Sequence, residues 1–151
     1  MPSTATPIRY FALIYGIVFL VVGIAGFVPG LMTPFELTDP AVTVNGTAGR
    51  LFGLFPVNSL HNLVHIVFGV WGLVAYRTLG ASITYARTVA VVYAILVILG
   101  LIPGAHTLFG LVPLYGHDVW LHLILAAVAA YFGFVAPRAG VEKATTHASR
   151  A

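Results

Sequence analysis

The chain has 151 residues, of which 60% are hydrophobic and 7% are charged, and its mean hydropathy is +1.00. A soluble domain carries about 25% charged residues, so seven Lys and Arg with four Asp and Glu are too few to cover a surface in water. The composition excludes a soluble enzyme. It also excludes a nucleic-acid partner, because no dense Lys/Arg patch is present. The lack of cysteine excludes disulfides, iron–sulfur clusters and thiolate zinc sites. The expected solvent is the lipid bilayer.

Four apolar segments are long enough for membrane-spanning helices, which need about 20 residues each. We place them near residues 10–28, 59–76, 87–102 and 118–136. Pro29 and Pro103, each followed by glycine, should end the first and third spans. Asn58 or Ser59 should cap the second. The expected fold is an all-α integral membrane protein with four transmembrane helices. One domain covers residues 1–138, and a flexible cytoplasmic tail covers residues 139–151.

The cationic residues are distributed unequally between the two sides of these spans. One side has only Arg50, whereas the side of the chain termini collects Arg9, Arg77, Arg87, Arg138, Lys143 and Arg150. The positive-inside rule therefore predicts cytoplasmic N and C termini in a multi-pass protein of the cell inner (plasma) membrane. The first connecting segment then lies outside, and its Asn45-Gly46 pair predicts a short hairpin turn.

The chain contains an internal repeat. Residues 51–56 (LFGLFP) recur as residues 108–113 (LFGLVP), an offset of 57 (108 − 51 = 57). At the same offset, His61 aligns with Asp118 and His65 aligns with His122. We interpret the chain as two pseudo-symmetric repeats of two helices each. An even number of spans per repeat keeps both copies in one orientation, with a pseudo-twofold axis along the membrane normal.

The second and fourth spans each carry ionisable residues on one helical face. His61 and His65 are four residues apart on the second span, as are Asp118 and His122 on the fourth. Small residues continue both faces: Gly69 and Gly72 on the second span, Ala126 and Ala129 on the fourth. Intramembrane polar residues usually face the bundle interior. We therefore expect the two faces to meet in the outer leaflet.

Three interpretations of this cluster stay open. In the first, it is a structural hydrogen-bond network in which His61 bonds Asp118, His65 bonds His122, and the small residues let the two helices pack closely. In the second, His61, His65, Asp118 and His122 are four ligands of zinc, iron, copper or manganese. In the third, His65 and His122 are the axial ligands of a b-type haem.

Other chemistry is scarce in the sequence. There is no Ser–His–Asp arrangement, pair of carboxylates or phosphate-binding loop, so no catalytic residue is assigned and a non-enzymatic role is favoured. His106 and His117 fall in the connection before the fourth span, where His117 is a candidate spare ligand. Asn58 and Asn62 are candidate supporting residues beside the histidines.

The segment Pro56-Val-Asn58 followed by His61-Asn62-Leu-Val-His65, with Asp118 and His122 later, resembles a bacterial family of four-span membrane proteins. That family is catalogued as domain of unknown function four-three-eight-three. The resemblance runs from about Arg9 to Arg138. It implies four helices and marks these same residues as characteristic, but it implies no activity. The segment Leu114-Tyr115-Gly116-His117 departs from the second motif expected of the family, which contains asparagine. A looser similarity to DoxX-type membrane subunits rests on topology.

Two functional hypotheses follow from the sequence. The first is a membrane protein that binds a metal ion or haem, and one form of this hypothesis gives the bound group a redox role. The alternative is a non-enzymatic accessory subunit, docked in a larger membrane protein complex or in a homo-oligomer, in which the cluster only joins two helices.

Overall fold

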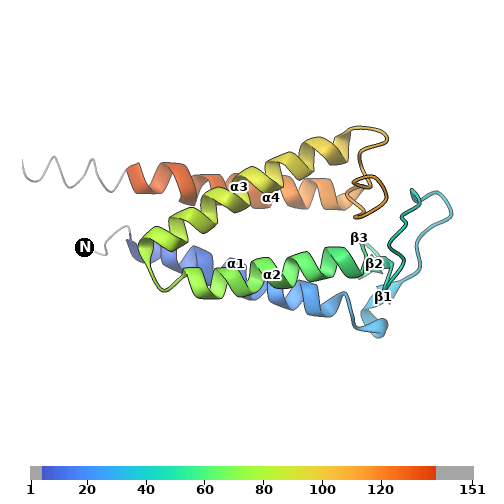
Figure 1. Cartoon of the computed structure of the whole chain (residues 1–151), viewed down its shortest axis with the longest axis horizontal. Helices are drawn as coiled ribbons and strands as arrows, with labels where there is room; N and C mark the ends of the chain where they lie inside the picture. The colour runs from blue at the N-terminus through green and yellow to red at the C-terminus, as the bar shows by residue number, and fades with distance from the viewer. Residues whose placement is uncertain (1–4, 139–151) are drawn as a thin grey trace, which may run out of the picture.

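The structure, a computed structural model, describes residues 5–138. It contains four α-helices: α1 (Ala5–Ala25), α2 (Ser59–Ala75), α3 (Leu79–Leu101) and α4 (His117–Ala130) (Figure 1). A π-helical segment, η2 (Tyr131–Val135), continues α4. Three helical stretches are long and apolar enough to cross a membrane, at Thr6–Ala25, Leu79–Leu101 and His117–Arg138, and α2 is a shorter apolar helix. The described chain is therefore a predominantly helical, membrane-type protein.

The helices run lengthwise between two ends of the molecule (Figure 1). We call the end where α1 begins and η2 finishes the terminal end, and the end that carries the strands and the α3–α4 connection the loop end. The predicted flexible tail, residues 139–151, lies outside the described residues.

Two of the predicted spans have different bounds in the structure. Helix α1 covers Ala5–Ala25 instead of 10–28, and α3 begins at Leu79 instead of near 87. The α3 prediction was wrong because Arg87 was taken as a limit of the apolar segment. The helix instead begins after Thr78, whose hydroxyl accepts a hydrogen bond from Ala81 N at 3.2 Å. The predicted bounds of the second and fourth helices differ from those observed by a few residues, and Asn58 caps α2 as expected.

The helices associate as two close pairs, α1 with α2 and α3 with α4 (Figure 1). Glycines bring α1 and α2 into backbone contact: a Cβ built on Gly72 would lie 2.7 Å from Gly16 Cα, and one on Gly69 would lie 2.7 Å from Leu20 N. The prediction that Gly69 and Gly72 face the fourth span was therefore wrong. They face α1, and their lack of side chains lets the two backbones approach this closely.

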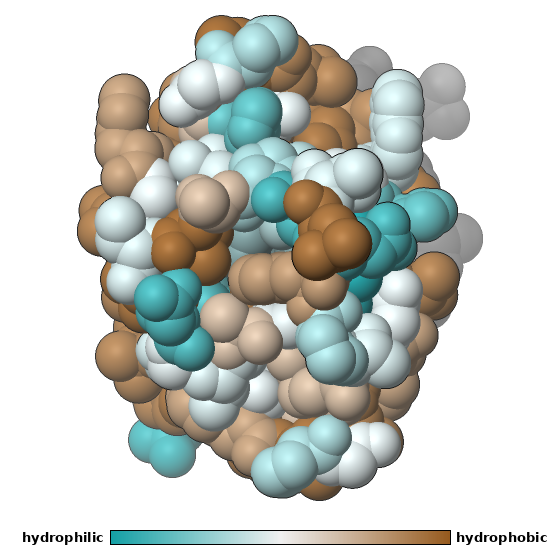
Figure 2. All heavy atoms as spheres, turned by 90° about the vertical axis from the view of Figure 1, so that its right-hand side faces the viewer, coloured by the Kyte–Doolittle hydropathy of each residue, from teal (hydrophilic) through white to brown (hydrophobic). Residues whose placement is uncertain are grey.

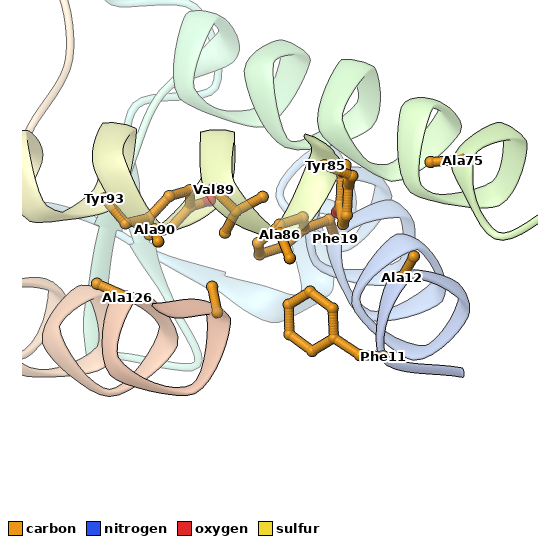
Figure 3. Close-up of a cluster of buried hydrophobic side chains, with 11 residues drawn as sticks. Phe11, Ala12, Phe19, Ala75, Tyr85, Ala86, Val89, Ala90, Tyr93 and Ala126 are labelled. Carbon is orange, nitrogen blue, oxygen red and sulfur yellow. The ribbon is translucent and has the colours of Figure 1, made fainter. Parts of the chain in front are cut away.

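The hydrophobic core lies between the two pairs. Figure 3 shows Phe11 and Phe19 of α1 next to Tyr85, Val89 and Tyr93 of α3, with small residues of the other helices around them. Ala126 and Ala129 of α4 belong to this cluster, so they pack in the α3-centred core and not on α2. Between α2 and α4, the Phe19 ring contacts His65 of α2 and stacks on the Tyr93 ring at a centroid distance of 5.5 Å, and Tyr93 contacts His122 of α4.

A small antiparallel sheet covers the loop end of α1 and α2. Its strands are β1 (Met32–Thr33), β2 (Gly49–Leu51) and β3 (Phe55–Val57), in the order β1-β2-β3. The β2–β3 turn contains Phe52 and Gly53, both with positive φ. The chain also turns at Asn45-Gly46, where Ala48 N donates to Asn45 O at 3.3 Å, but no strand directly precedes this turn, so the predicted hairpin does not form there. Glycine adopts a positive φ with less strain than residues that carry a side chain, so Gly53 suits its position in this turn.

The corresponding connection between α3 and α4 forms turns and no strand among the described residues. Phe109 and Gly110 nevertheless have positive φ, as do Phe52 and Gly53 at the equivalent positions of the sequence repeat. Thr43 ties the two connections together, because its N donates to Gly110 O at 2.8 Å. Hydrophilic and hydrophobic residues are interspersed over this end of the molecule (Figure 2).

Candidate metal centre

The start of α2 is held in place by Asn58. Its side-chain Oδ1 accepts a hydrogen bond from His61 N at 2.9 Å. Its Nδ2 donates to Val44 O at 3.1 Å and to Leu111 O at 2.8 Å, so one buried amide joins both loop-end connections to the helix. Because the cap fixes where α2 begins, it also fixes the direction in which His61 points.

Asn62 provides a second anchor, one helical turn after Asn58. Its Nδ2 donates to Gly26 O at 2.8 Å, at the loop end of α1, and lies 3.3 Å from Thr47 Oγ1. The two asparagines that the sequence marked as supporting residues are thus buried and bonded to backbone around the histidines.

Three buried histidines converge from α2 and α4. One ring nitrogen of each of His61, His65 and His122 lies within 4.8 Å of those of the other two. The residues are 4%, 8% and 1% exposed, respectively. The His61 ring stacks on that of His65 with centroids 4.7 Å apart and lies 6.0 Å from that of His122. The polar faces of α2 and α4 therefore meet as expected, but through their histidine side chains and without close approach of the two helix backbones.

The hydrogen bonds of the cluster define the free nitrogen of His65. Its Nδ1 lies 3.0 Å from His61 O, and since a carbonyl only accepts, Nδ1 carries the proton. Nε2 of His65 is then left with its lone pair. On α4, His122 Nδ1 lies 3.5 Å from Asp118 Oδ2. This carboxylate can orient the imidazole so that Nε2 of His122 is the available ligand atom.

Several polar atoms of the cluster are buried without a hydrogen-bond partner in the described part of the chain. They are His61 Nδ1, His122 Nδ1 and Asp118 Oδ2. The cross-helix bonds of the predicted structural network, His61 to Asp118 and His65 to His122, do not form. The oxygens that approach two of the imidazoles belong to the same helix, one turn away: His61 O for His65 and Asp118 Oδ2 for His122.

Aromatic side chains enclose the cluster on the side of the core. Phe19 meets the His65 ring edge-on at a centroid distance of 5.6 Å, and Tyr93 meets the His122 ring at 4.7 Å. Both residues are buried. The histidines thus occupy an apolar, closely packed surrounding. Neither aromatic residue carried a recognisable signal in the sequence.

Two further histidines of the described residues, His106 and His117, lie apart from this group. His117 is the first residue of α4 and is exposed, and His106 lies beside Tyr115 with ring centroids 6.1 Å apart. Neither belongs to the three-histidine group, so the candidate role of His117 as a spare ligand gains no support from its position.

A partly buried ion pair at the loop end was not foreseen from the sequence. Arg50 Nη2 and Nε lie 2.5 Å and 3.0 Å from the two carboxylate oxygens of Asp39, and Glu36 N donates to the same carboxylate at 2.9 Å. The hydrogen bonds that Arg50 donates to Asp39 raise the pKa of the Arg50 guanidinium. Burial raises the pKa of the neighbouring Tyr115 to about 12. The signal available was that Arg50 is the single cation predicted outside.

Comparison with known protein families matches residues 9–135 to the family described as Domain of unknown function (DUF4383). This range contains the whole of the three-histidine group and all four helices apart from the first residues of α1. No curated protein and no solved structure matches the chain. The DoxX-type similarity therefore stays an analogy of topology.

Proposed function

The chain belongs to the DUF4383 family, and we propose that it is an integral membrane protein that holds a transition metal ion with His61, His65 and His122. The observation that carries the proposal is the convergence of three buried imidazoles whose neighbouring polar atoms lack partners. An unpartnered buried polar group costs about 1–3 kcal/mol. A cluster whose only role was structural would be expected to satisfy these groups within the protein.

The donor set suits a borderline metal ion. Three imidazole nitrogens without thiolate are typical ligands of zinc, copper and iron, and a three-ligand site leaves a position open for water or substrate. Metal–nitrogen bonds of about 2.0–2.1 Å would place the nitrogens about 3.4 Å apart. The three nitrogens, now within 4.8 Å of one another, would need to approach by about 1 Å.

Asp118 has a different role in this proposal from the one the sequence favoured. Its carboxylate lies beside His122 Nδ1 and would accept that proton, in the way that carboxylates orient metal-bound histidines. We therefore assign Asp118 as a positioning residue and leave the three histidines as ligands. Manganese, which prefers oxygen ligands, becomes the weakest of the four candidate metals.

A b-type haem on His65 and His122 fits the surroundings less well. The Phe19 and Tyr93 rings lie against these two imidazoles, and the His61 ring stacks on His65. A porphyrin between the two ligands would have to displace all three rings, whereas a single ion needs only a small movement of the imidazoles.

The proposal includes the finer architecture expected from the sequence: four spans, two repeats, cytoplasmic termini and a place in the inner membrane. Left-handed backbone at Phe52-Gly53 and at Phe109-Gly110, at the 57-residue offset, supports the repeat. The pairing of α1 with α2 and of α3 with α4 is also what two tandem two-helix units require.

The test is elemental analysis of detergent-purified protein after expression in metal-replete medium without chelators. We expect about one metal ion per chain for the wild type and background for His65→Ala/His122→Ala. His106→Ala is the matched control, because it removes a histidine outside the cluster and should keep the metal. Background metal in correctly folded wild-type protein would refute the proposal. An absorption spectrum would distinguish haem iron from a non-haem ion.

The second candidate function is an accessory subunit of a larger membrane complex. It is favoured by the exposed aromatic residues at the loop end: Phe109 is 81% exposed and Phe52 is 58% exposed, both in a strained left-handed conformation. For this role, Phe52→Ser/Phe109→Ser should release a copurifying partner while metal content stays at background in every variant.

A further inference from the structure

Arg87 occupies an unusual position for a charged residue. It follows the first residue of α3 by eight positions, about 12 Å along the helix, inside the segment that is apolar enough to cross a membrane. Its Nε donates to Gly133 O at 2.9 Å, on the neighbouring η2 segment. Because Pro137 has no N–H, it cannot supply the usual helical donor four residues after Gly133. Arg87 supplies one instead.

The bond to Gly133 fixes the guanidinium and leaves its outer edge free. Arg87 Cζ lies 5.4 Å from the centroid of the Phe134 ring. Gly133 lets α3 approach η2 closely at Arg87, since a Cβ on Gly133 would lie 3.0 Å from Arg87 N and Cγ. With Nε committed to the carbonyl, both Nη groups remain, and no side-chain acceptor for them exists among the described residues.

Charge at the terminal end is uncompensated within the described chain. The three acidic residues within 5–138, Glu36, Asp39 and Asp118, all lie at the loop end, where Asp39 pairs with Arg50. The arginines described at the terminal end are all exposed: Arg9, Arg77, Arg87 and Arg138. Arg138 follows Phe134 by four residues, so it lies on the same helical face one turn closer to the terminal end.

An apolar stripe leads away from Arg87 toward the loop end. Val91 and Ile95 follow it at intervals of four residues on the same face of α3 and are 51% and 50% exposed. On the adjacent helix, Tyr131 and Val135 are also exposed. A guanidinium held by its Nε at the end of an apolar stripe, with further arginines at the same end of the molecule, is complementary to an amphiphile with an anionic head.

We infer that the surface between α3 and η2 is a binding site for an anionic phospholipid. The Nη groups of Arg87 hold the phosphate, Arg138 adds a second positive charge, and an acyl chain lies along Val91 and Ile95. Arginine binds phosphate through two parallel N–H donors, which matches the free edge of a guanidinium held by its Nε. The inference is independent of the metal centre at the loop end.

The experiment is a titration of the full-length, detergent-purified protein, followed by native mass spectrometry. The probes are dioleoyl phosphatidylglycerol, dioleoyl phosphatidylcholine, which has the same chains and a zwitterionic head, and inorganic phosphate. We expect the wild type to prefer phosphatidylglycerol over phosphatidylcholine by about fivefold to tenfold, the value of one or two charge-assisted contacts. Arg87→Gln should abolish this preference.

Arg9→Gln is the matched control. Arg9 is also an exposed terminal-end arginine whose Nε donates to a helix-end carbonyl, Tyr76 O at 2.7 Å. The variant loses the same charge and the same kind of backbone bond, and it should keep the preference. Equal loss in Arg9→Gln and Arg87→Gln would overturn the inference in favour of general surface charge.

A second variant covers the case in which Arg87→Gln does not fold. Arg138→Gln leaves the bond to Gly133 in place and should lower the preference about threefold to fivefold. An unchanged preference in Arg138→Gln, or none in the wild type, would contradict the site. Displacement of phosphatidylglycerol by inorganic phosphate at equal concentration would assign the site to free phosphate and overturn the lipid assignment.

Discussion

The two helix pairs achieve close packing by different means. In α1–α2 the backbones touch, because Gly16, Gly69 and Gly72 present no side chains at the contact. In the α3–α4 pair, alanines face tyrosine and valine in the core, and the backbones approach closely at Gly133, within the π-helical segment that continues α4. The first pair is held by backbone contact between two regular helices. The second combines side-chain packing with the hydrogen bond from Arg87 Nε to Gly133 O.

This difference explains where polar chemistry can reside. Each pair buries its own inner surface, and the space between the pairs is filled by rings from both, including Phe19 and Tyr93 (Figure 3). The histidines lie at this junction, two from the first pair and one from the second. A site at such a junction responds to any change in how the pairs dock, so variants within a pair and variants across the junction should behave differently.

The largest expected effect comes from the side chain that joins the pairs. Asn58→Ala removes a buried helix cap and the bonds to Val44 O and Leu111 O, and should lower the free energy of unfolding by about 2–4 kcal/mol. Thr78→Ala is the matched control, since Thr78 caps α3 with a single exposed bond and should cost about 1 kcal/mol. Equal losses in chemical denaturation would show that Asn58 acts only as a cap.

A smaller effect is expected within the first pair. Gly72→Ala places a methyl group 2.7 Å from Gly16 Cα and 2.8 Å from Ala12 O, and should destabilise the protein by about 1–3 kcal/mol. The matched control is Gly80→Ala, because no atom lies within 4 Å of a Cβ at that helical position. It should be neutral or stabilise by up to about 1 kcal/mol. The melting temperatures of both variants in one detergent test the comparison, and equal changes would contradict it.

The smallest effect concerns the connection before α4. Burial raises the pKa of Tyr115 to about 12, so its neutral form is favoured in the folded protein. The associated stability is complete below the unfolded pKa of about 10 and is lost as pH rises through the folded value. We expect the melting temperature of the wild type to fall more steeply between pH 10 and 12 than that of Tyr115→Phe. Parallel curves for the two proteins would contradict this assignment.

Local sequence features predicted the helices well where the determinants are local. Asn58 precedes α2 as its N-cap and Asp118 lies in the first turn of α4. Both stabilise a helix N-terminus by acting on residues close to them in the sequence. The α3 start was misplaced because Arg87 was assumed to need water. The structure satisfies one of its donors with Gly133 O, a partner 46 residues away.

The turn at the loop end shows the same limit. Asn45-Gly46 is a strong hairpin signal by itself, but β2 begins later, at Gly49, where it pairs with both β1 and β3. A Cβ at Gly49 would lie 2.5 Å from Thr33 O, so this glycine permits the close β1–β2 approach. Pairing with two neighbours outweighed the preference of a single dipeptide.

For the candidate site, helical spacing was sufficient to group His61 with His65 and Asp118 with His122, since positions four apart share a face in any α-helix. Hydropathy was likewise sufficient for a membrane-type helical protein, because too few charges are present to cover a surface in water. Partner choice needed the tertiary structure. Gly69 and Gly72 pack against α1, Asp118 approaches His122 instead of His61, and Arg87 bonds Gly133, because contacts between helices depend on rotation and spacing that no single segment encodes.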